Sequence, residues 1–247
     1  MPDVHAFPSP DALATAAAER ILSALREALA ARGRASLVLS GGSTPEPVFR
    51  RLAARPDALD WPRVHVFWSD ERCVPPDDAD SNYGLARQTL LDALPIPEAQ
   101  VHRMACESGG PADAAQRYAD TLRAYFDGAE ALFDVTLLGL GADGHVASLF
   151  PDDDAVDAPN GWVMATEAPP SSPVAQRLTL TLPALNASRL VLFLVAGASK
   201  REALRRVLRP TDPEAPLPAA RVRPVGDLAW YVDRAALGDD EGPDGGV

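Results

Sequence analysis

The feature that most constrains the fold is the alternation of strand-like and helix-like patterns along the 247 residues. Residues 189–197, RLVLFLVAG, are almost continuously apolar, which is typical of a central strand covered on both faces. The pattern predicts an α/β fold, a modified Rossmann-like arrangement with a largely parallel sheet and helices on both faces. Strands are expected at 35–40, 64–69, 133–139, 161–168, 177–183, 189–197 and 228–233, and helices at 10–32, 45–54, 81–93, 112–127 and 199–208.

The organisation of the chain is simple. No linker divides residues 1–237, which we expect to form one domain, and the acidic, glycine-rich stretch 238–247 lacks periodicity and predicts disorder. The start of the chain has no signal-peptide pattern, and the longest apolar runs are far shorter than a membrane span. We therefore expect a cytoplasmic protein without a membrane partner. The sequence does not determine the oligomeric state, for which a monomer is the default expectation.

The net charge of −12 limits the classes of partner. No basic stripe offsets it, which argues against a nucleic-acid partner. It does not argue against a small anionic substrate, because surface charges are screened beyond roughly 8 Å at physiological salt. Lys200 is the one lysine among 23 basic residues, so a compact ammonium is expected to have a specific use there.

The cysteines and histidines do not predict a metal centre or a disulfide framework. Cys73 and Cys106 are expected to be free thiols, because disulfides are rare in cytoplasmic proteins. The four histidines lie far apart, and none has the spacing of a structural zinc ligand. We expect neither a metal nor a cofactor.

Three stretches that follow predicted strands carry unusual polar residues. Residues 39–47, LSGGSTPEP, combine two glycines with hydroxyls at a helix start, which suits an anion, although an ordinary strand-to-helix turn has the same pattern. Asp70, Glu71 and Arg72 follow the strand at 64–69, where a solvated charged loop is the alternative. Lys200 and Arg201 lie in a first helical turn, where a bound anion would offset their repulsion by the helix dipole.

The stretch 137–151, LLGLGADGHVASLFP, allows two interpretations. Its glycines match the G-x-G-x-x-G fingerprint of dinucleotide-binding folds, but that fingerprint normally opens the first βαβ unit and is followed by an acidic residue after the next strand. Here it lies past the middle of the chain and is followed by a loop. The second interpretation is acid–base chemistry, because free imidazoles titrate near pH 6.5 and Asp143 could orient His145.

Taken together, these stretches resemble the 6-phosphogluconolactonase family. The resemblance rests on LSGGSTP, FWSDERCVPPDDADSNYG, FDVTLLGLGADGHVASLFP and RLTLTLPALNASRLVLFLVAGASK, and it extends to about residue 233. It implies the fold shared with glucosamine-6-phosphate deaminase and hydrolysis of 6-phospho-D-glucono-1,5-lactone to 6-phospho-D-gluconate, the second step of the oxidative pentose phosphate pathway. The implied partner is a phosphorylated sugar lactone, with no metal or cofactor.

The resemblance also implies roles for individual residues. His145 would act as general base on water, Arg72 would stabilise negative charge, and Asp70 and Asp143 would orient these groups or hold sugar hydroxyls. The implied phosphate-binding residues are Gly41, Gly42, Ser43, Thr44, Arg177 and Lys200.

Two alternatives remain beside the lactonase. The deaminases have an acidic residue before the proline of the D-G-H loop, where Phe150 stands here, and a D-E-Y sequence where this chain has Asp70-Glu71-Arg72. A non-catalytic sugar-phosphate sensor would keep the anion site but could lose the base. This chain retains both His145 and the anion turn, which favours an enzyme.

Overall fold

The structure is a computed structural model. It describes residues 3–107, 109–126, 133–151, 153, 156, 161–210 and 216–238. Almost all of the predicted acidic tail, from residue 239 onward, lies outside these residues.

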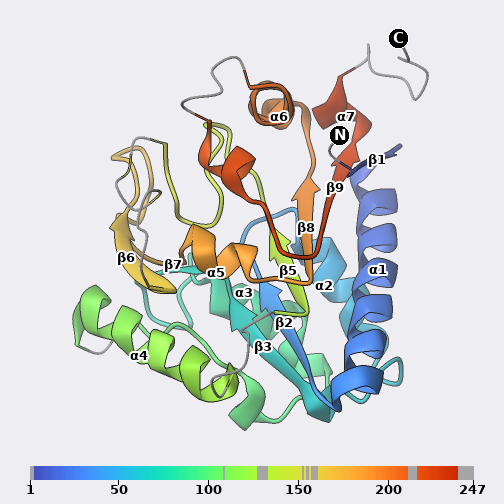
Figure 1. Ribbon diagram of the computed structural model, residues 1–247, viewed down its shortest axis with the longest axis vertical. Coiled ribbons are helices and arrows are strands. Elements are labelled where there is room, and N and C mark those ends of the chain that lie inside the picture. The colour runs from blue at the N-terminus through green and yellow to red at the C-terminus, as the bar shows by residue number, and fades with distance from the viewer. Residues whose placement is uncertain are drawn as a thin grey trace.

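The centre of the molecule is a six-stranded sheet in the order β1-β9-β8-β5-β2-β3 (Figure 1). Every neighbouring pair in this sheet is parallel. The α/β prediction is confirmed, and the strand 190–195 is fully buried, as its continuous apolar run indicates. The strands are β1 (Asp3–Phe7), β2 (Ala35–Leu39), β3 (Val64–Trp68), β5 (Val135–Leu138), β8 (Leu190–Val195) and β9 (Asp227–Asp233).

Helices flank the sheet. α1 starts at Ser9, whose hydroxyl accepts from the Ala12 N–H at 3.2 Å, and ends at Gly33 with φ of 71°, as the sequence predicts. In Figure 1, α1 lies to the right of the sheet and α4 lies on the opposite side. The helices are α1 (Pro10–Arg32), α2 (Glu46–Ala53), α3 (Asn82–Thr89), α4 (Gly110–Phe126), α5 (Leu182–Asn186), α6 (Arg201–Leu208) and α7 (Arg234–Leu237).

A second, three-stranded antiparallel sheet has the order β4-β7-β6. Its strands are β4 (Asp70–Arg72), β7 (Gln176–Leu180) and β6 (Val163–Glu167). Ser69 joins the two sheets, because its N–H donates to Leu39 in the large sheet at 2.8 Å and its carbonyl accepts from Leu180 in the small one at 2.7 Å. The charged residues 70–72 therefore form a strand rather than a solvated loop, and the side chains of Asp70 and Glu71 are buried.

Other boundaries differ from the sequence expectations at polar or edge positions. The strand expected at 177–183 ends at Leu180, because Thr181 caps α5 and accepts a hydrogen bond from Ala184. The helix expected at 81–93 ends at Thr89 and is followed by a separate 3-10 turn. The edge strand β1 was not predicted, since its five residues are mostly exposed and lack a clear apolar alternation.

The expectation of free thiols is wrong in this structure. Cys73, directly after β4, forms a disulfide with Cys106 in the segment before α4, with 5.0 Å between the Cα atoms. The sequence separation of 33 residues gives no sign of this contact. The tertiary fold creates it, because the small sheet carries residue 73 toward the segment that leads into α4.

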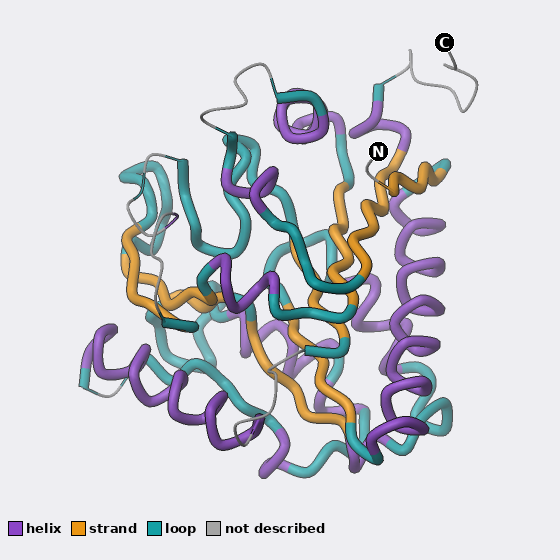
Figure 2. The backbone as a smooth tube through the Cα atoms, viewed as in Figure 1, coloured by secondary structure: helices purple, strands orange, loops and turns teal. Residues whose placement is uncertain are grey.

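The parallel strands end at one edge of the large sheet, and the tube view shows the connecting loops gathered there (Figure 2). The segments after β2, β5 and β8 carry the anion turn, the Asp143–His145 stretch and Lys200, respectively. Ligands of open α/β sheets bind beyond this edge. The topology thus brings three of the sequence motifs together.

A histidine pair occupies the other end of β3. The Nδ1 atom of His65 and the Nε2 atom of His102 are 3.0 Å apart, and the rings are stacked. Phe67 and Tyr125 pack against the pair. Burial is the main cause that lowers the pKa of His102 to about 4, and the charge of the neighbouring His65 adds to this shift. Burial also lowers the pKa of His65.

This pair predicts an acid-sensitive contribution to stability. His102 takes up a proton near pH 6.5 in the unfolded chain but only near pH 4 in the folded protein. The free energy of unfolding should therefore decrease as the pH is lowered from 6.5 to 4. The loss should be about 1–2 kcal/mol, less than the full shift implies at about 1.4 kcal/mol per pKa unit, because the ring is partly exposed and solvent screens its charge. Denaturant unfolding across this pH range should show it, and His102→Phe should flatten the curve while the control His5→Phe should not. An unchanged slope in His102→Phe would contradict the assignment.

Candidate active site

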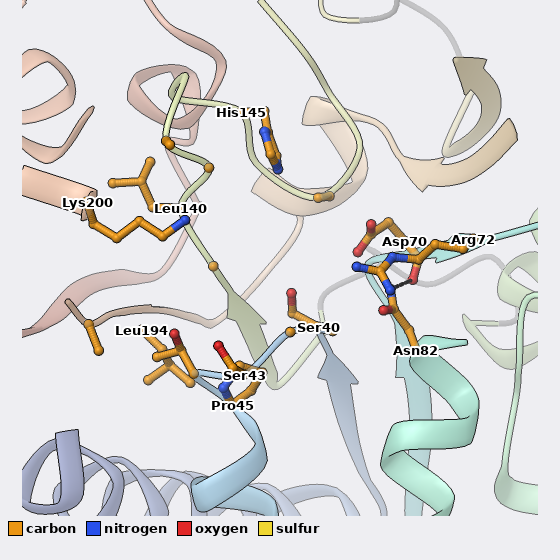
Figure 3. Close-up of a pocket in the computed structure, with 18 residues that line it drawn as sticks. Ser40, Ser43, Pro45, Asp70, Arg72, Asn82, Leu140, His145, Leu194 and Lys200 are labelled. Carbon is orange, nitrogen blue, oxygen red and sulfur yellow. Dashed lines mark hydrogen bonds between the residues drawn. The ribbon is translucent and has the colours of Figure 1, made fainter. Parts of the chain in front are cut away.

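A cavity of about 280 Å³ opens at the carboxyl edge of the large sheet. Figure 3 shows the His145 ring pointing into it, with Lys200 on one side and Asp70 and Arg72 on the other. Of the ten residues that the sequence assigns to the site, eight line this cavity: Gly41, Gly42, Ser43, Thr44, Asp70, Arg72, His145 and Lys200.

The turn at 41–44 joins β2 to α2 and forms the floor of the cavity. Gly42 has φ of 101°, a conformation that favours glycine. A side chain at Gly41 would overlap the Asn82 carboxamide, so only glycine allows this close approach. The position before α2 is Pro45, which makes no side-chain cap. The Ser43 and Thr44 hydroxyls are not used to cap α2 and lie at the cavity wall beside its first turn.

The loop after β5 holds His145 in a defined orientation. The Asp143 carboxylate accepts from the His145 backbone N–H at 3.1 Å and lies 2.6 Å from the imidazole Nδ1. A methyl group at Gly141 would overlap the imidazole. Phe150 contacts the ring, with 4.8 Å between centroids. The ring is thus fixed by a carboxylate, a glycine and an aromatic neighbour.

The electrostatics of this pair favour an ionised Asp143. Partial burial would raise the pKa of Asp143, but the backbone hydrogen bond from His145 and the charge of its ring outweigh burial and lower the pKa below its usual value. An ionised Asp143 favours the tautomer in which Nδ1 carries the proton. In that tautomer Nε2 carries no proton, and no hydrogen bond joins it to the residues described.

Lys200 extends into the cavity from the loop after β8. That loop is held by Asp233, whose carboxylate accepts from the Gly197 N–H at 3.0 and 3.1 Å. Partial burial lowers the pKa of Lys200, and the charge of Asp143 opposes this shift. No ion pair or side-chain hydrogen bond joins its ammonium to the described part of the chain. Lys200 is therefore available to a ligand.

Asp70 connects the two sides of the cavity. Its carboxylate accepts from the Ser148 hydroxyl at 2.8 Å and from the Ser69 hydroxyl at 3.1 Å. Ser148 lies three residues after His145, so this bond fixes the base-bearing loop to β4. The structure gives Asp70 a role in holding the His145 loop rather than a direct contact with the Arg72 guanidinium.

Glu71 is a buried carboxylate behind the cavity wall. Burial raises its pKa to about 7, although hydrogen bonds from three backbone N–H groups act to lower the pKa. Arg72, the next residue, lines the cavity, and its Nη1 donates to the Asp80 carbonyl at 2.6 Å.

Arg177 lies outside the cavity lining. It pairs with Arg72 across β4 and β7, and its guanidinium donates to Ser172 at 2.6 Å and to the Val174 carbonyl at 3.1 Å. Burial lowers the pKa of Arg177, and the positive charge of Arg72 lowers it further. Arginines directly opposite one another on paired strands repel, so an anion bound near the two side chains would relieve the repulsion.

The sequence interpretation gave no site role to three polar residues that shape the site. They are Asn82, which lines the cavity, Glu71, and Ser148, all buried. Each lies inside one of the quoted motifs, and their roles depend on contacts between segments that are far apart in the chain. Among the residues the structure describes, no group of three or more metal-binding side chains could hold an ion, and no helix could span a membrane.

Comparisons with known proteins agree with this geometry. The family model of glucosamine-6-phosphate isomerases/6-phosphogluconolactonase matches residues 8–230. The chain is 38% identical to a 6-phosphogluconolactonase of Nostoc over 94% of its own length and 96% of that protein, and 42% identical to the human 6-phosphogluconolactonase over 94% and 92%. The crystal structure of 6-phosphogluconolactonase from Thermotoga maritima superposes with a TM-score of 0.81 at 34% identity, covering 94% of this chain and all of that one.

The close contact at Gly141 predicts the effect of adding one methyl group there. Gly141→Ala should displace the His145 ring and break its bond to Asp143, at a cost of about 1–3 kcal/mol, typical of overpacking. The matched control is Gly139→Ala, because a methyl at Gly139 meets no atom within 4 Å. Crystal structures and thermal unfolding of both variants would measure this, and an unmoved His145 in Gly141→Ala would contradict it.

Proposed function

The chain belongs to the glucosamine-6-phosphate isomerase/6-phosphogluconolactonase family, and from this premise we propose that it hydrolyses 6-phospho-D-glucono-1,5-lactone to 6-phospho-D-gluconate. Curated relatives at about 40% identity over most of the chain carry the name of that enzyme. The observation that supports the proposal best is the oriented Asp143–His145 pair above a cavity whose floor is a glycine-rich turn beside Lys200.

The first step is attack of water on the lactone carbonyl. His145, held through Nδ1 by Asp143, takes a proton from the water at Nε2 as the oxygen bonds to the carbonyl carbon. General base catalysis of this kind contributes about 10²–10⁴ in rate. Arg72, across the cavity, stabilises the negative charge that develops on the carbonyl oxygen.

The second step opens the ring. The tetrahedral intermediate re-forms the carbonyl, the bond to the ring oxygen breaks, and protonated His145 returns its proton to that oxygen as it becomes a hydroxyl. The product is the open-chain acid. A lactone is an activated ester, so the step requires neither a covalent nucleophile nor a cofactor.

The phosphate group is assigned to the turn of residues 41–44. Backbone N–H groups and the hydroxyls of Ser43 and Thr44 lie at the start of α2, where an anion is favoured. Lys200 supplies a positive charge, and Arg177, beside Arg72 on the neighbouring strand, would add to the positive potential.

The surroundings of His145 favour a lactonase over an isomerase. Moving protons on and off carbon requires more than one carboxyl group near the reacting atoms. Beside the imidazole the structure has the hydrogen-bonded carboxylate of Asp143 and the apolar ring of Phe150. The other carboxylate that lines the cavity, Asp70, already accepts from the hydroxyls of Ser69 and Ser148. A single base for water is sufficient for lactone hydrolysis.

The proposed function is tested by a coupled assay. Glucose-6-phosphate dehydrogenase generates the lactone, and acid release is followed with and without the protein, because the lactone also opens spontaneously. A clear acceleration is expected. Sugar-phosphate binding without acceleration would indicate a sensor, and ammonia release from glucosamine 6-phosphate would indicate the deaminase.

Removing the base should abolish most of the turnover. His145→Ala should lower kcat by about 10²–10⁴ and leave the fold intact, because the side chain is one-third exposed and its loss opens little of the core. Steady-state kinetics and circular dichroism check this prediction. A folded His145→Ala enzyme with wild-type kcat would exclude the assigned base.

Lys200 is expected to contribute to binding of the phosphate group. Lys200→Ala should raise KM for the phosphorylated lactone by about 10- to 100-fold, the range for loss of a charged hydrogen bond. KM for unphosphorylated gluconolactone should change little. Equal effects on the two substrates would show that Lys200 does not contact the phosphate.

A further inference from the structure

Glu71 accepts hydrogen bonds from two segments at once. Its side chain is 4% exposed. Oε1 accepts from the backbone N–H groups of Arg72 at 2.8 Å and Asn82 at 2.6 Å, and Oε2 accepts from Tyr83 N–H at 2.7 Å and the Ser81 hydroxyl at 3.2 Å. Four donors thus fill the acceptor capacity of the ionised carboxylate, and the three backbone N–H groups among them oppose the rise in pKa that burial causes.

Three of these donors belong to the start of α3. The first N–H groups of a helix have no partner within the helix, and a negative charge is favoured there. Ser81 caps the same helix by accepting from the Gly84 N–H at 3.0 Å. Glu71 therefore fixes the beginning of α3 to strand β4.

The segment 80–83 in turn holds both neighbours of Glu71. The Asp80 carbonyl accepts from Arg72 Nη1 at 2.6 Å, and Asn82 Nδ2 donates to the Asp70 carbonyl at 2.9 Å. Each of the three residues of β4 is thus bonded to this one segment. Asn82 also packs directly on Gly41 of the anion turn.

We propose that Glu71 is a positioning residue for Arg72: by fixing residues 80–83 to β4, its carboxylate keeps the Asp80 carbonyl where it holds the Arg72 guanidinium at the cavity wall. The inference rests on the proposed function, because it takes Arg72 as the group that stabilises the developing oxyanion. Glu71 itself does not line the cavity and acts through Arg72.

Glu71→Gln tests the proposal with little change of shape. A carboxamide has one acceptor oxygen, so its NH₂ group would face one of the two pairs of donors and push residues 80–83 away from β4. The expected result is a 10- to 100-fold lower kcat for the phosphorylated lactone, with KM within about threefold of wild type. A kcat within threefold of wild type would overturn the proposal.

A double-mutant cycle separates positioning from a general effect on stability. In the Arg72→Ala background, Glu71→Gln should lower kcat no further, because the residue through which it acts is gone. An equal loss in both backgrounds would overturn the proposal. If Glu71→Gln is not recovered folded, Glu71→Asp, which keeps the charge but is one methylene shorter, replaces it in the same cycle with the same criteria.

Asp134 provides the matched control. It is a second buried carboxylate, which accepts from the Ser36 N–H at 2.8 Å and from Arg32 at 2.5 Å, just before β5 and away from the cavity. Asp134→Asn should lower the Tm but leave kcat unchanged, and a kcat loss equal to that of Glu71→Gln would overturn a specific role for Glu71. A wild-type protein that does not accelerate lactone opening would instead refute the proposed function.

Discussion

The parallel register of the central sheet is the constraint on which the site depends. Because β2, β5 and β8 are neighbours or next neighbours and run in the same direction, the segments that follow them meet at one edge. The anion turn at residues 41–44, the base His145 and Lys200 lie far apart in sequence. No local interaction brings them together. Hydrogen bonding between buried strand backbones does so.

Short contacts at the edge of the sheet then fix the positions of these groups relative to one another. Gly41 allows Asn82 to pack on the anion turn, and Gly141 allows the imidazole to lie over the loop that carries it. The Asp70–Ser148 hydrogen bond connects strand β4 with the loop of His145. These buried polar groups have partners from distant segments, so each contact specifies one arrangement of the cavity wall.

Periodicity and turn signals predicted the central sheet except for the edge strand β1, together with the ends of α1, and the family resemblance named eight of the residues that line the cavity. The sequence could not show that Ser69 transfers the chain from one sheet to the other, because this depends on Leu39 and Leu180, which lie far away in sequence. For the same reason residues 70–72 suggested a solvated loop. The disulfide between Cys73 and Cys106 was not predicted, because the sequence argument rested on the expected cellular compartment and could not show that the two residues lie close together. The structure places Arg177 opposite Arg72 on the neighbouring strand, a relation that pairing of β4 with β7 determines and composition does not.

The isolation of Lys200 has a chemical consequence. It is the one ε-amino group in the sequence, it lines the cavity, and burial lowers its pKa, so a larger share is unprotonated at neutral pH than for an exposed lysine. Acylating reagents attack the unprotonated amine. A single labelling reaction would therefore mark the cavity alone among the side chains, and protection by a bound sugar phosphate could be followed by intact-mass spectrometry.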